Sequence, residues 1–144
     1  MGASGWLYFV PFQRSEQAAL DSLREEVFAR DADYYREEGV ESPAALMAGG
    51  WLEEQGAHSV LDVDRVVRCE PDAEEVGDVR VVEGPEVVEL FGTATPSHET
   101  VEQAVKSRRR EWFPPFDRGS GCCTVVYDGG NRPEALCFWG VTGD

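Results

Sequence analysis

Apolar residues at helical spacing predict a first helix over 16–30. Leu20, Leu23 and Val27 recur at positions i, i+3 and i+7, which places them on one face of a helix. Ser15 comes immediately before this segment, where its hydroxyl can accept a hydrogen bond from an N–H group of the first turn. The pattern therefore predicts a capped helix with one buried face.

Proline next to a capping residue marks three further helix starts. Proline suits the first helical position because its φ is already close to the helical value. Apolar residues then continue at helical spacing. The charged segment 31–41, which contains Gly39, is predicted to be a loop. The three helices are predicted from Pro43 toward Gly56, from Pro85 to Phe91 and from Thr95-Pro96 to Trp112.

Shorter apolar runs predict the strands. The run 6–12 is apolar at both alternating sets of positions, which is typical of a central strand covered on both sides or closely flanked. In 60–67, Asp62 and Asp64 alternate with apolar residues, which indicates a strand with one solvated face. The turn sequence 128–131 between two apolar runs predicts an antiparallel hairpin. The predicted strands cover 6–12, 60–67, 79–82, 122–127 and 135–141.

The order of these elements predicts one α+β domain. A chain of 144 residues is one domain by length, and no low-complexity linker divides it. We expect a sheet of about five strands, partly antiparallel, that ends in a C-terminal β-hairpin. Three to four helices are expected to pack mainly on one face of this sheet.

The net charge limits the classes of partner that this domain can bind. The chain has 28 Asp and Glu residues against 13 Lys and Arg, which gives a net charge of −15 and a pI near 4.4. Clustered cations bind phosphate backbones and anionic lipids, so this composition argues against nucleic acid and membrane surfaces as partners. The charge is also uneven, because residues 71–104 carry −8 and residues 105–118 carry +3.

Several kinds of site find no support in the sequence. The apolar run 6–12 is too short for a secretory signal or a membrane span, which predicts a cytoplasmic location. In that reducing compartment the cysteines are expected to pack in the core rather than pair. Neither a C-x-x-C zinc motif nor a phosphate-binding glycine loop is present, so no metal and no cofactor are expected. The cysteines are Cys69, Cys122, Cys123 and Cys137.

Three polar residues are the candidates for catalysis or ligand binding. Asp62 and Asp64 are two residues apart on a predicted strand, so their carboxylates would share a face and could ligate a hard cation or act as acid and base. His58 precedes that strand on a loop, where functional side chains often lie. The same spacing is typical of a solvated strand face, and Arg65 and Arg68 lie close enough in the sequence to offset the charge.

Two charged patches are the candidates for partner binding. The first, which we call the acidic loop, is formed by Glu70, Asp72, Glu74, Glu75 and Asp78. The second is a basic patch at the end of the last predicted helix, where cations also complement the helix dipole. Its members are Arg108, Arg109, Arg110 and Trp112.

The leading hypothesis is therefore a non-enzymatic, acidic binding protein that masks a basic partner protein. An acidic field accelerates encounter with a cationic partner, as in inhibitors of the immunity or antitoxin type. The lack of isoleucine, with Lys106 as the single lysine, favours a bacterial genome of high GC content. The alternative hypothesis is a small enzyme or ligand-binding protein, with an aromatic pocket that includes His58, Asp62 and Asp64.

Overall fold

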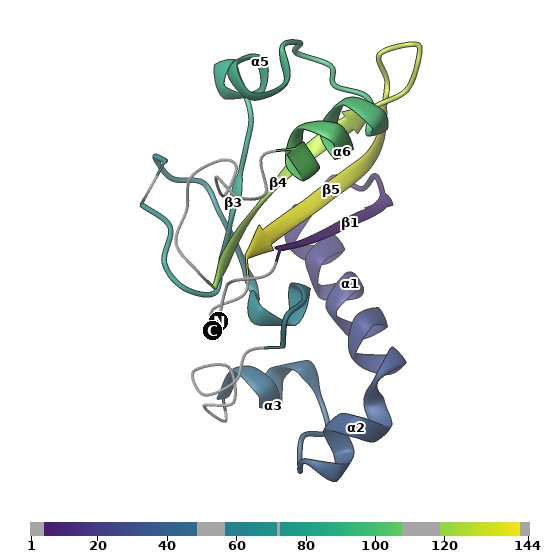
Figure 1. Ribbon diagram of the computed structural model, residues 1–144, viewed down its shortest axis with the longest axis vertical. Helices are drawn as coiled ribbons and strands as arrows, with labels where there is room; N and C mark the ends of the chain where they lie inside the picture. The colour runs from purple at the N-terminus through teal and green to yellow at the C-terminus, as the bar shows by residue number, and fades with distance from the viewer. Residues whose placement is uncertain (1–4, 49–56, 72, 108–118, 142–144) are drawn as a thin grey trace.

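A five-stranded mixed sheet organises the molecule (Figure 1). The computed structural model describes residues 5–48, 57–71, 73–107 and 119–141. The strands are β1 (Gly5–Pro11), β2 (Arg65–Val67), β3 (Asp78–Val81), β4 (Ser120–Tyr127) and β5 (Pro133–Val141). Their order across the sheet is β1-β5-β4-β3-β2; β5 is antiparallel to β1 and β4, whereas β3 is parallel to β4 and β2. The predicted α+β class and the C-terminal hairpin are confirmed.

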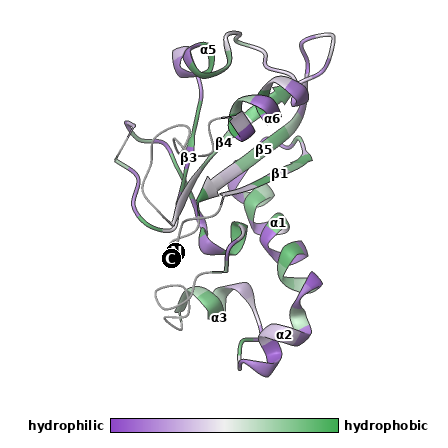
Figure 2. Cartoon of the chain, viewed as in Figure 1, coloured by the Kyte–Doolittle hydropathy of each residue, from purple (hydrophilic) through white to green (hydrophobic). Residues whose placement is uncertain are grey.

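Helices cover both faces of this sheet in the described part of the chain. They are α1 (Glu16–Arg30), α2 (Ala32–Glu37), α3 (Pro43–Ala48), α5 (Pro85–Phe91) and α6 (His98–Ser107), with a short 3₁₀ helix η1 (Val60–Asp62). The residues of α1, α2, α3 and η1 join one apolar cluster. Those of α5 and α6 join a second cluster on the opposite face. In Figure 2, α1 alternates between hydrophobic and hydrophilic segments, as a helix with one buried face should.

Neighbouring cysteines of β4 show how the sheet divides the two cores. Because side chains alternate along a strand, Cys123 packs with Leu20 in the first cluster and Cys122 packs with Trp139 in the second. Both cysteines are fully buried, as predicted. The central strands are therefore covered on both faces.

Serine side chains cap the N-termini of α1 and α3. Ser15 Oγ accepts a hydrogen bond of 3.1 Å from the Ala18 N–H at the start of α1, and Ser42 Oγ accepts one of 3.1 Å from the Ala45 N–H at the start of α3. Gly92 ends α5 with φ of 77°, a left-handed conformation that glycine adopts without steric cost. The predicted bounds of α1 and α5 match the structure because these signals are local.

Three predictions about the elements are wrong. β1 is an edge strand and not a central one, because an apolar pattern reports covered faces and not the number of neighbouring strands. Segment 31–41 contains the helix α2, held by Tyr35 stacked on Phe28 with ring centroids 5.0 Å apart. Only β2 is a strand within 60–67, since the first residues form η1 and their apolar side chains are buried together rather than alternately.

Candidate functional site

One of the three candidate catalytic residues, Asp62, is buried and does not reach the surface with the other two. Asp62 is 4% exposed, and its Oδ1 accepts a hydrogen bond of 2.6 Å from the Ala57 N–H. Asp64 and His58 are exposed. The predicted same-face arrangement of the two aspartates is therefore wrong, because Asp62 belongs to η1 and not to a strand. None of these three residues lines either of the two pockets described below.

The acidic loop divides into buried and exposed carboxylates. Glu74 and Asp78 are 6% and 4% exposed. Asp78 accepts hydrogen bonds of 2.9 Å from Arg65 Nε and from the Glu75 N–H, so its charge is used within the fold. Glu70 and Glu75 are exposed and can meet a partner.

A buried ionic cluster joins the acidic loop to α5. Arg80, on β3, is 1% exposed and donates two hydrogen bonds to the Glu86 carboxylate, of 2.6 Å and 2.9 Å. Its Nε lies 3.6 Å from a carboxylate oxygen of Glu74. Burial opposes the charge of the guanidinium, but the hydrogen bonds to Glu86 and the two carboxylate charges outweigh it and raise the pKa of Arg80. The charge of Arg80 is therefore held inside the protein.

Above this cluster lies a groove of about 360 Å³, which we call the acidic groove. Arg68 and Arg80 line it, and both are already paired: Arg68 donates to Glu16 at 2.6 Å and to Glu83 at 2.8 Å. No ion pair among the described residues involves Glu70 or Glu89. Four carboxylates line the groove against these two arginines, and because Glu83 and Glu86 pair with them, the excess of negative charge is carried by Glu70 and Glu89.

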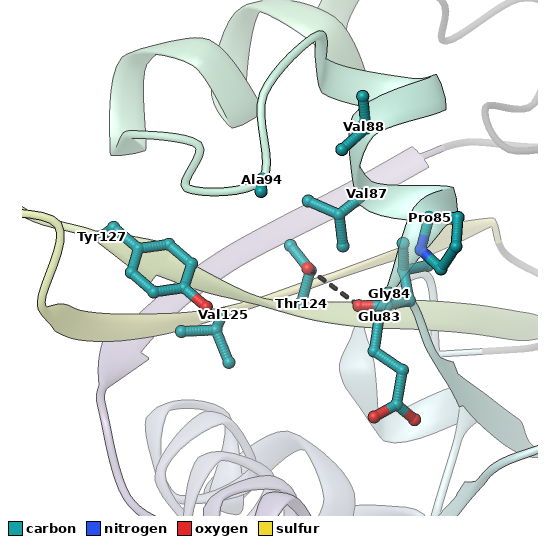
Figure 3. A pocket seen from close by; sticks show the side chains of 10 residues that line it. Glu83, Gly84, Pro85, Val87, Val88, Ala94, Thr124, Val125 and Tyr127 are labelled. Atoms are coloured by element: carbon teal, nitrogen blue, oxygen red, sulfur yellow. Dashed lines mark hydrogen bonds between the residues drawn. The ribbon is translucent and has the colours of Figure 1, made fainter.

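An apolar pocket of about 350 Å³ adjoins the acidic groove (Figure 3). The two share Glu83 and Pro85. The pocket lies where the chain leaves β3 for α5, and the hydroxyl of Thr124 donates a hydrogen bond of 3.0 Å to the Val82 carbonyl at its base. Its walls are mostly apolar and include Val87, Val88, Ala94, Val125 and Tyr127.

The cysteines are poor nucleophiles in this fold. Cys122, Cys123 and Cys137 are buried, and burial raises the pKa of each thiol. The prediction of core packing is wrong for Cys69, which is exposed beside the acidic groove. There, partial desolvation and the nearby Glu74 carboxylate also raise its pKa. Raised pKa values leave little thiolate at neutral pH, so these sites disfavour nucleophilic catalysis by cysteine.

Native protein is expected to expose a single reactive thiol per chain to Ellman's reagent. Cys69 should react slowly at neutral pH, and its rate should keep increasing through the alkaline range because its pKa is raised. The other three thiols should react only after denaturation. The matched control is Cys69→Ser, which should show almost no native reaction; fast labelling of that variant would contradict the burial of the remaining cysteines.

Five of the residues predicted to bind a partner are not among those that the structure describes. Asp72 and the basic patch Arg108, Arg109, Arg110 and Trp112 lie outside the described residues. Within the described ranges, no group of three or more His, Cys, Asp or Glu side chains is placed to hold a metal ion. The same part of the chain contains no helix of the length and apolar character needed to cross a bilayer.

Comparisons with family models, with curated proteins and with solved structures give no match to this chain. The function is therefore inferred from the geometry of the site.

Sequence reasoning missed the second rim of the acidic groove. Glu83, two residues before α5, and Glu89, on α5, line the groove together with Glu70 of the acidic loop. A signal existed, because Glu86 and Glu89 are three residues apart on a predicted helix and so share one of its faces. What the sequence does not show is that β3 places this helix beside the loop.

Proposed function

We propose that the chain is a non-enzymatic binding protein that docks a basic partner protein at the acidic groove. The observation that carries this proposal is the excess of carboxylates around two arginines whose charges are already paired. A lysine or arginine side chain of a partner would complete the local charge balance. The proposed function is the masking of a basic surface, as in inhibitors of the immunity or antitoxin type.

The net charge supports the same proposal at longer range. A chain of −15 attracts a cationic partner before contact and raises the rate of encounter. At the groove, the exposed Glu70 and Glu89 can then make direct ion pairs. The long-range attraction and the local ion pairs thus both favour a cationic partner.

The apolar pocket favours a protein over a small cation as the partner. Val88 is 47% exposed at the pocket, and the pocket adjoins the groove through Glu83 and Pro85. An interface needs apolar contact beside its charged contacts, because apolar area supplies affinity and charge supplies orientation and rate. A basic residue followed by an apolar one would fill both cavities.

Binding of an oligoarginine peptide to isotope-labelled protein tests the location of this site. We expect backbone amide shifts concentrated in 68–71 and 83–89, and an affinity that falls as salt screens the charges. The variant Glu70→Lys with Glu89→Lys is expected to weaken binding by about ten-fold or more, because it replaces two attractions with two repulsions.

The matched control is Glu25→Lys with Glu37→Lys, which changes the net charge equally at exposed positions of α1 and α2. This control should retain most of the affinity. Equal loss in the two variants, or shifts scattered over the whole surface, would show that the peptide senses only the overall charge and would overturn the proposed site.

A further inference from the structure

The outer edge of β1 offers a backbone ladder for another strand. Among the described strands, β1 pairs with β5 alone, and no strand is paired to its outer side (Figure 1). Residues 5–11 read Gly-Trp-Leu-Tyr-Phe-Val-Pro and contain no charge. Most of their side chains are only half-buried, consistent with an edge position.

The register identifies the backbone groups that face outward. The Phe12 N–H donates to the Glu134 carbonyl at 3.2 Å, so Phe12 points toward β5. Backbone groups alternate along an antiparallel strand, so Val10, Tyr8 and Trp6 also point toward β5. The N–H and C=O groups of Leu7 and Phe9 therefore point away from the sheet.

The two edges of the sheet differ in their protection. β2, at the opposite edge, has three residues, and the charged Arg65 lies on it with its guanidinium bound to Asp78. Short strands and charges are the usual means of preventing edge pairing. β1 has seven residues, and within the described ranges Pro11 at its end is the one feature of the strand that opposes edge pairing. An uncharged edge of this length is suited to strand addition.

We propose that β1 pairs with β1 of a second copy of this chain and forms a dimer with one continuous sheet. Antiparallel pairing centred on Tyr8 overlaps the whole strand and places Leu7 of one copy opposite Phe9 of the other, where their outward groups exchange hydrogen bonds. Trp6 then lies opposite Val10. The Leu7–Phe9 pair is an aromatic–aliphatic pair, which is favourable across strands, and no like charges oppose each other in the ladder.

Charge separates this inference from the proposed function. Two copies of −15 repel each other, so salt should strengthen the dimer by screening. Salt should weaken the binding of a cationic partner at the acidic groove. The two interactions therefore respond in opposite directions, and each can fail without the other.

Sedimentation over a range of protein concentrations, at low and high salt, tests the dimer. The native chain should show a monomer–dimer equilibrium that shifts toward dimer in high salt. Leu7→Glu, which places a like charge in the ladder of each copy, should weaken the dimer by about ten-fold or more. The matched control Val88→Glu adds the same charge at an exposed position of α5 and should leave the dimer nearly unchanged.

Disulfide trapping tests the register. In a Cys69→Ser background, Tyr8→Cys should give a covalent dimer on oxidation, because directly opposed residues of a non-hydrogen-bonded pair lie at a distance that a disulfide spans. Leu7→Cys should not, because Phe9 and not Leu7 lies opposite. Sedimentation as a monomer at every concentration and salt, or trapping through Leu7→Cys instead of Tyr8→Cys, would overturn the proposal.

Discussion

Replacing Arg80 with methionine is expected to lower the free energy of unfolding by about 3–5 kcal/mol. The substitution removes the cation and leaves two carboxylates near each other, of which the Glu74 side chain is 1% exposed and the Glu86 side chain 22% exposed. An uncompensated buried charge is far more costly than the loss of a surface ion pair. Urea denaturation followed by circular dichroism measures the change.

Arg30→Met is the matched control for this loss. Arg30 and Glu26 form an ion pair of 2.9 Å on α1 in which both side chains are largely exposed, so its removal should cost less than about 0.5 kcal/mol. Adding Glu74→Gln and Glu86→Gln to Arg80→Met should restore part of the lost stability, because no charge is then left buried. A similar cost for Arg80→Met and Arg30→Met would contradict the buried ionic cluster.

Local signals made much of the fold predictable from the sequence. Ser15 and Ser42 cap helices through contacts within three residues, and the turn after β4 is formed by its own Gly-rich sequence. Strand order was not predictable in the same way. β1 looks central because its side chains are apolar at every position, but whether a strand has one or two neighbours depends on pairing with distant segments.

The candidate site was predictable only in part. Its charge was visible in the sequence, because most residues that line the groove fall within 71–104, which carries −8. Burial was not visible, and so Glu74 and Asp78 could not be distinguished from the exposed Glu70 and Glu75. Arg80 was a signal of burial, because an arginine between valines on a short strand needs buried carboxylates. The structure supplies them from Glu74 and Glu86, which are six residues away on either side, and not from the nearer Asp78 and Glu83.

The buried ionic cluster links the stability of the fold to the proposed binding surface. Arg80 binds Glu86, which lines the groove, and so holds α5 against β3. The exposed carboxylates near Glu86 are therefore held in a fixed arrangement. A fixed arrangement of charge loses less conformational entropy when a partner binds. Variants of Arg80 should therefore weaken cation binding even when the protein remains folded.

Gly140→Ala is expected to lower the free energy of unfolding by about 3 kcal/mol, because the new methyl group has no space. A Cβ at this position would overlap Cζ2 of the Trp6 indole and lie 2.7 Å from the Ser120 carbonyl oxygen. The indole also covers Gly121, where a Cβ would lie 2.6 Å from the Trp139 carbonyl oxygen. The indole of the edge strand β1 thus lies against two glycines of the neighbouring strands. Thermal and urea denaturation measure the loss.

The matched control is Gly129→Ala in the hairpin turn, where a Cβ would meet nothing within 4 Å and the change should be close to neutral. Combining Gly140→Ala with Trp6→Leu should give a double variant that is more stable than the sum of the two single losses predicts, because the smaller side chain removes one of the two clashes. The remaining contact with the backbone of Ser120 should keep the rescue incomplete. Strict additivity would mean that Trp6 does not pack on Gly140, and β1 would then lose its main anchor to the sheet.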